Sequence, residues 1–121
     1  MITEDYVSFE VAKLLKEKGF NEPIWTRYED DNEVIFGDKY NWNNSPMGHT
    51  SAPTHQMAKK WLREEHNLYV EIFVTWRDKI PHYQWRINNL ITQDTIVDTP
   101  CLEKPEEAVE AALKYTLENL I

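Results

Sequence analysis

The chain has 121 residues, of which 41% are hydrophobic and 28% charged, and its formal net charge at pH 7 is −8. This length suits one domain with a real hydrophobic core, and a content of only three glycines excludes a fibrous or disordered chain. We therefore expect a single domain over residues 1–121.

The negative charge is concentrated at one end of the sequence. Residues 1–23, 24–91 and 92–121 carry net charges of −2, −1 and −5. Such a chain is repelled by phosphate backbones, which disfavours plain nucleic-acid binding. Solubility is the simplest explanation of the charge. A second interpretation is that the acidic C-terminal end mimics nucleic acid.

Cysteine usage and hydropathy indicate the compartment. Cys101 is the sole cysteine and has no internal disulfide partner, which is typical of a reducing cytoplasm. No apolar run approaches the length of a membrane span, and residues 1–5 are polar and acidic, unlike a secretion signal. We expect a cytoplasmic protein with no membrane contact.

The first third of the chain predicts a helix followed by a β-hairpin. Ser8 is a suitable N-cap for the helix, and Gly19 a suitable left-handed residue at its end. Residues 24–29 and 33–37 are predicted strands, and Asp and Asn at 30–32 are typical of the turn between them.

Residues 38–52 predict a long irregular loop, because they are rich in Asn, Ser, Pro and Gly. Long loops within compact domains are often functional. The loop contains Tyr40 and Trp42, which either pack on the edge of the core or form an exposed aromatic surface that favours binding. One hypothesis is that this loop acts as a lid over a ligand.

The centre of the sequence predicts a helix that folds back on its own strand. Thr54 is a suitable N-cap, a helical stripe includes Trp61, and Asn67 tolerates the left-handed conformation that ends helices. From residue 68 the period changes to two. One face of the strand then holds Leu68, Val70, Ile72, Val74 and Trp76, and the other holds Tyr69, Glu71, Phe73, Thr75 and Arg77.

The last third predicts a turn at residues 78–81, a return strand at 82–90, an edge strand within 92–99 that ends before Pro100, and a helix from Pro105. Short turns between successive strands make each pair antiparallel. The predicted fold is α+β. It has a single antiparallel sheet of four to five strands, with three helices packed on one face, in the order α-β-β-α-β-β-(β)-α.

No motif for catalysis or cofactor binding is present. The glycines are too isolated for a phosphate loop, and Cys101 lacks the context of a nucleophile. A metal site at His49 and His55 has no supporting Cys pair or His-Glu-x-x-His pattern. We predict no catalytic, cofactor-binding or metal site, and no cofactor.

The remaining candidate is a surface. If the Leu68 face of the central strand packs on the helices, the opposite face is open, and the first hairpin adds residues to it. The predicted interaction surface comprises Trp25, Arg27, Tyr40, Trp42, Tyr69, Phe73, Arg77 and Arg86. Aromatic and arginine side chains are enriched in protein interfaces, although they also stack on bases. Antiparallel sheets often leave one face in water without any function.

Three segments resemble a known group of proteins. They are residues 6–20 (YVSFEVAKLLKEKGF), 52–68 (APTHQMAKKWLREEHNL) and 106–120 (EEAVEAALKYTLENL). The chain resembles a family of uncharacterised small proteins encoded by anaerobic gut bacteria and their prophages. The family has no assigned activity, so no site residue follows from the resemblance. It implies an accessory protein of a phage or mobile element that acts by binding.

The leading functional prediction is therefore a non-enzymatic accessory protein that binds another protein. The alternatives are a small ligand-binding protein or enzyme that uses the 38–52 loop as a lid, and the acidic nucleic-acid mimic. The identity of the protein partner and the oligomeric state stay open at this point.

Overall fold

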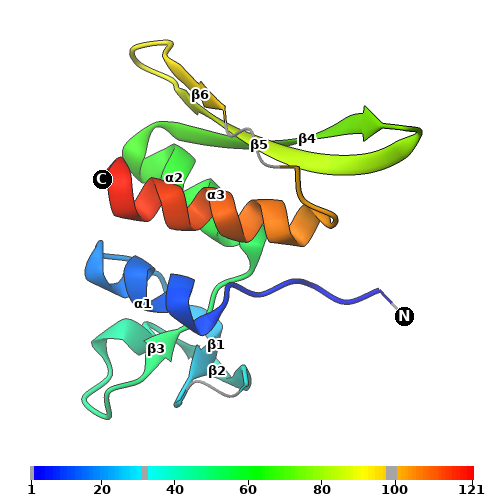
Figure 1. Ribbon diagram of the computed structural model, residues 1–121. Helices are drawn as coiled ribbons and strands as arrows, with labels where there is room; N and C mark the ends of the chain where they lie inside the picture. The colour runs from blue at the N-terminus through cyan, green and yellow to red at the C-terminus, as the bar shows by residue number, and fades with distance from the viewer. Residues whose placement is uncertain (1, 31–32, 98–100) are drawn as a thin grey trace. The chain divides into compact units, whose positions relative to one another are not determined.

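The computed structural model describes residues 2–30, 33–97 and 101–121. The chain divides into two compact units, Met1–Ala58 and Lys59–Ile121, which are described separately below. The elements, shown in Figure 1, are α1 (Phe9–Glu17), β1 (Ile24–Tyr28), β2 (Ile35–Tyr40), the 3-10 helix η1 (Trp42–Asn44), β3 (Thr50–Ser51), α2 (His55–His66), β4 (Leu68–Arg77), β5 (Ile80–Asn89), β6 (Thr95–Val97) and α3 (Pro105–Asn119).

The helix ends form as the sequence predicts. The Ser8 Oγ accepts a hydrogen bond from the Val11 N–H at 3.2 Å at the start of α1, and Gly19 follows the helix with a φ of 91°. At α2, the Thr54 Oγ1 accepts from the Met57 N–H at 3.1 Å. Asn67 ends α2 with a φ of 56°. Each cap depends only on neighbouring residues, which is why local sequence chemistry predicts it.

The α+β class with three helices is confirmed, but the predicted sheet is wrong. The structure has two three-stranded antiparallel sheets, in the orders β2-β1-β3 and β4-β5-β6, instead of a single sheet of four to five strands covered on one face by all three helices. The predicted element order is also wrong, because a strand is present before α2.

The segment at residues 38–52 explains this error. β2 continues into it as far as Tyr40, and β3 lies near its end. β3 pairs with β1 through Arg27 and Ser51 and through Tyr28 and Thr50. β1 therefore uses both of its edges within the first unit. A two-residue strand among Asn, Ser, Pro and Gly residues has no periodic signal from which it can be predicted.

Two predicted features fall partly outside the described residues. In the turn at 30–32, Asp31 and Asn32 are not described, and neither are residues 98–100 at the end of the predicted edge strand. β6 is described over Thr95–Val97, which confirms a strand in that region.

The core of the first unit follows the alternation of β1. Ile24, Thr26 and Tyr28 are buried, whereas Trp25 on the other face is 60% exposed. The Tyr28 hydroxyl donates to the Val7 carbonyl at 2.7 Å. The Thr26 hydroxyl donates to the Ala52 carbonyl, also at 2.7 Å, so both buried polar groups are satisfied.

The core of the second unit lies between α3 and one face of the β4–β5 hairpin. The register places Val70 opposite Ile87 and Ile72 opposite Trp85, which puts all four on one face. The ring of Trp85 lies 5.1 Å from that of Tyr115 on α3, measured between ring centres. The buried residues of α3 are Ala108, Val109, Ala112, Leu113, Thr116 and Leu117.

The prediction that the whole Leu68 face of β4 is covered is wrong beyond the middle of the strand. Leu68 and Val70 are buried, but Val74 is 45% and Trp76 67% exposed. A strand of ten residues is about 33 Å long, whereas a helix of 15 residues is about 22 Å long. Figure 1 shows the tip of the hairpin extending past the first turn of α3.

A matched pair of tryptophan substitutions tests whether this face of the hairpin is buried at one end and exposed at the other. We expect Trp85→Ala to lower the free energy of unfolding by about 3–5 kcal/mol, because it removes a buried ring from the core. Trp76 lies on the same face as Trp85, but its ring is mainly in water. Trp76→Ala should therefore lower the free energy of unfolding by less than about 1 kcal/mol. Urea denaturation followed by circular dichroism, at low micromolar protein concentration, measures both. Equal losses would show that this face is covered along its whole length.

Candidate functional site

The eight residues of the predicted surface fall into two groups. Trp25, Arg27, Tyr40 and Trp42 belong to the first unit, and Tyr69, Phe73, Arg77 and Arg86 belong to the second. The strands that carry them are in different sheets. The hypothesis that Trp25 and Arg27 share an open sheet face with Phe73 is therefore wrong, and each group is a separate candidate.

In the first unit, Arg27 and Trp42 are bound to each other. The Arg27 guanidinium lies 4.4 Å from the centre of the Trp42 ring, and the Trp42 Nε1 donates to the Ile24 carbonyl at 2.9 Å. Gly37 makes room for this pair, because a Cβ at that position would overlap the Arg27 Nη1. The Arg27 side chain is only 16% exposed. These two residues stabilise the unit and offer little free surface to a partner.

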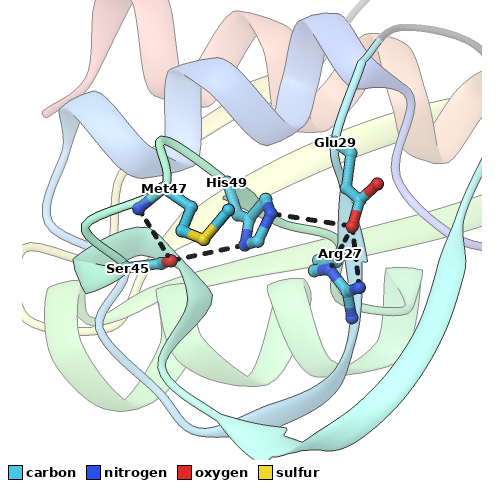
Figure 2. A network of polar contacts seen from close by, with 5 residues as sticks. All are labelled: Arg27, Glu29, Ser45, Met47 and His49. Carbon is cyan, nitrogen blue, oxygen red and sulfur yellow. Dashed lines mark hydrogen bonds and ion pairs between the residues drawn. The ribbon is translucent and has the colours of Figure 1, made fainter.

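Figure 2 shows a network of polar contacts beside this pair. The Ser45 Oγ lies 3.3 Å from the His49 Nδ1, and the His49 Nε2 lies 3.6 Å from the Glu29 Oε1. Serine, histidine and a carboxylate connected in this order form the catalytic arrangement of many hydrolases. Sequence reasoning missed this set, because Glu29 is far from the other two in sequence and no motif links them.

The contacts of the network favour a structural role over a catalytic one. The Glu29 Oε1 also accepts from the Arg27 Nη2 at 2.8 Å and from its Nε at 3.3 Å, so it is already paired with a cation. The Ser45 Oγ accepts from the Met47 N–H at 3.2 Å. Both contacts of His49 exceed the range of about 2.6–3.2 Å over which a general base works. The network joins residues 45–49 to β1.

Further hydrogen bonds fasten the segment at residues 38–52. Asn43 and Ser51 bond reciprocally, since the Asn43 N–H donates to the Ser51 Oγ at 3.1 Å and the Ser51 N–H donates to the Asn43 Oδ1 at 2.8 Å. The Asn43 Nδ2 also donates to the Phe20 carbonyl at 2.7 Å. The Lys16 Nζ donates to the His49 carbonyl at 2.8 Å. These hydrogen bonds tie the segment to α1, to Phe20 and to β3, and the lid hypothesis stays a prediction.

In the second unit, a polar ladder crosses the face of the sheet that points away from α3. The Glu71 carboxylate accepts from the Arg86 Nε at 3.0 Å and from the Asn88 Nδ2 at 2.8 Å. The Arg86 guanidinium also lies 4.7 Å from the centre of the Phe73 ring. Phe73 is half-buried. The ladder links β4 to β5 on this face and leaves Tyr69, 42% exposed, at its border.

Exposed apolar side chains of this unit lie at the end of the hairpin, and also at Leu90 and Ile91, which are 50% and 71% exposed. Val74, Trp76 and Ile80 are 45%, 67% and 58% exposed, and Arg77 is exposed beside them. We call Val74, Trp76, Arg77 and Ile80 the hairpin end. The turn that joins the strands consists of Asp78 and Lys79, both with positive φ, 51° and 66°. Sequence analysis placed only Arg77 of these four on the surface. A comparison of the length of β4 with that of α3 indicates that the helix does not cover the whole strand.

Metal-ligand clusters and membrane-spanning helices are both absent from residues 2–30, 33–97 and 101–121. No group of three or more His, Cys, Asp or Glu side chains there is arranged to hold a metal ion. Over the same ranges, no helix has the length and apolar character that crossing a membrane requires. The Cys101 Sγ lies 3.8 Å from the Thr75 Oγ1.

Comparison of the chain with protein-family models, with curated proteins and with solved structures finds no match. A functional proposal for this chain therefore depends on the geometry of its own residues. The resemblance to small prophage proteins stays a prediction.

Asn43 provides a test of how the 38–52 segment is held. Asn43→Ala removes the donor to the Phe20 carbonyl and the acceptor for the buried Ser51 N–H, so we expect a loss of about 2 kcal/mol or more in the free energy of unfolding. The neighbouring exposed Asn44→Ala is the control and should change it by less than about 0.5 kcal/mol. Urea titration measures the free energy of unfolding of both variants. If Asn43→Ala leaves it unchanged, the hydrogen bonds of Asn43 do not hold the segment in place.

Proposed function

We propose that this chain is a non-enzymatic, cytoplasmic accessory protein of a phage or mobile element, and that it acts by binding another protein molecule through the hairpin end. The observation that carries the proposal is the exposure of Trp76, which is 67%, on the same face of the hairpin as Val74, which is 45% exposed. Single exposed apolar residues are ordinary on protein surfaces, whereas adjoining large ones mark interaction sites.

The chemistry of the hairpin end suits a protein partner. Tryptophan and arginine are the residues in which binding energy is most often concentrated, and the hairpin end presents Trp76 on one face and Arg77 on the other. Trp76 buries a large area when it is covered, at a low entropy cost, because it has few rotatable bonds. The residues on either side of it, Thr75 and Arg77, pair with His82 and Ile80 on β5.

The opposite face of the hairpin supports this site. The Glu71–Arg86 ion pair and the contact of Arg86 with the Phe73 ring link β4 to β5 on this face, and such cross-strand contacts favour an ordered surface. An ordered surface binds with a smaller entropy cost than one that must be ordered on contact. Tyr69 and Arg77, predicted from the sequence to bind, lie on this face.

An acyl-transfer enzyme is the second candidate, because of the Ser45–His49–Glu29 arrangement. A fluorophosphonate probe distinguishes it, since such probes react with serines activated by a histidine base. We expect no labelling of Ser45 in the native protein, because Glu29 is paired with Arg27 and both contacts of His49 are long. Labelling that disappears in His49→Ala would contradict a non-enzymatic function and make this network an active site.

A photo-crosslinking capture tests the binding proposal directly. A benzophenone amino acid at Lys79, beside the hairpin end, is expected to cross-link a protein from cytoplasmic extract. Trp76→Ser combined with Arg77→Ala should reduce the yield by about tenfold or more, as the loss of a binding centre does. Trp25→Ser is the matched control, since Trp25 is 60% exposed but belongs to the first unit. Equal yields from the two variants would refute the hairpin end as the binding site.

A further inference from the structure

β4 is a long strand at the edge of its sheet. The strand order β4-β5-β6 places it at one end, and it extends over ten residues from Leu68 to Arg77. In the described part of the chain, no backbone hydrogen bond is made to the side of β4 that faces away from β5. Such an edge is a ready template for another strand.

The hydrogen bonds of β5 show which β4 groups point outward. The Tyr83 N–H donates to the Leu102 carbonyl at 2.7 Å, and the Leu102 N–H donates to the Tyr83 carbonyl at 2.9 Å. Both polar backbone groups of Tyr83 therefore point away from β4. Tyr83 is opposite Val74, so Val74 also directs its N–H and carbonyl away from β5. Because these directions alternate along a strand, Ile72 and Trp76 also point their N–H and carbonyl groups away from β5.

The edge of β4 lacks most of the features with which proteins usually block strand addition, although it carries the charged side chains of Glu71 and Arg77. Short length, lysine, proline and bulges are the usual devices. β6 has three residues, and β2 contains Gly37 and Lys39. β4 contains no Pro, Gly or Lys, and its part from Ile72 to Arg77 lies beyond the buried Leu68 and Val70.

We infer that β4 pairs antiparallel with β4 of a second copy of this chain, about a two-fold axis at Val74. This inference rests on the proposed function, because it names the molecule that the hairpin end binds. The outward groups of Ile72, Val74 and Trp76 form the new ladder, and the two sheets become one of six strands. Because each copy uses the same edge, the contact closes as a dimer and does not continue into a fibre.

Complementarity of the side chains selects Val74 as the centre. In this register Arg77 lies opposite Glu71 of the second copy, whose carboxylate also accepts from Arg86 and Asn88 of its own chain, and the symmetry repeats that pair. Trp76 lies opposite Ile72 on the other face, again twice. Opposite charges and aromatic–β-branched pairs are favourable cross-strand neighbours. A centre at Ile72 would place Trp76 opposite the buried Leu68, where the side chains of the monomer already fill the space.

The local charge permits the contact although the whole chain is acidic. Residues 68–89 contain three basic and two acidic residues, a net charge of +1, whereas the chain carries −8. Repulsion between copies therefore comes from distant charges, which physiological salt screens over about 8 Å.

Mass measurement by light scattering after size exclusion, over a range of concentrations, tests the dimer. We expect a mass that rises from 14.4 kDa to twice that value. Val74→Pro removes an outward N–H that β5 does not use, so it should weaken the dimer about tenfold or more and leave the circular dichroism spectrum unchanged. If Val74→Pro does not fold, Val74→Lys replaces it, since it places two like charges opposite each other. Val97→Lys, 49% exposed on β6, is the matched control and should dimerise normally.

Cysteine cross-linking tests the register. In a Cys101→Ser background, Val74→Cys places the two thiols on the axis, with Cα atoms about 5.5 Å apart, and should form a disulfide dimer on mild oxidation. Trp76→Cys is more exposed in the monomer, but its two copies would lie about 13 Å apart, so it should cross-link far more slowly.

The outcomes separate this inference from the proposed function. A chain that stays monomeric into the millimolar range, or a dimer that Val74→Pro and Val74→Lys do not weaken, overturns strand pairing. Cross-linking of Trp76→Cys that is as fast as that of Val74→Cys overturns the register. If the chain is monomeric and the Lys79 probe still captures a different protein, the self-pairing is wrong and the proposed function stands. If the probe captures nothing and no dimer forms, both are wrong.

Discussion

The two-residue turn between β4 and β5 is the constraint on which the second unit depends. Asp78 and Lys79 both adopt positive φ, the conformation that joins antiparallel strands without splaying them. This turn pairs Arg77 with Ile80 and thereby sets every later pair along the hairpin. A shift of β5 by one residue would move Trp85 and Ile87 to the face opposite Val70. The core, the Glu71–Arg86 ladder and the outward edge all follow from this register.

Sequence periodicity predicts what neighbouring residues decide. The caps at Ser8 and Thr54, the three helices and the alternation of β4 are local, and the structure confirms them. The division into two sheets depends on β3 pairing with β1, between residues more than twenty positions apart. No local pattern contains that pairing, because β3 has only two residues and their burial comes from the strand beside them. Partition of strands among sheets is therefore the part of this fold that the sequence alone does not predict.

The candidate site shows the same division. Strand alternation separates the two faces of β4 correctly, but it says nothing about how far a neighbouring helix reaches along the strand. Trp76 has the pattern of a core residue and is exposed because α3 is shorter than β4. Arg27 and Trp42 have the composition of an interface and are largely occupied by each other. Residue type identifies side chains that are able to bind, and the packing of the monomer decides which of them remain available.

The hairpin end combines exposed apolar side chains with backbone groups that point out of the sheet. Elsewhere in the described residues, aromatic rings near arginines are partnered within the unit, as Trp42 is with Arg27 and Phe73 with Arg86. At the hairpin end, exposed side chains and outward backbone groups occur on the same residues, Val74 and Trp76. Both have one cause, which is a strand that extends beyond the helix packed on it. Because a partner that adds a strand there satisfies the backbone and covers Trp76 in one step, strand addition is the mode of binding that this geometry favours.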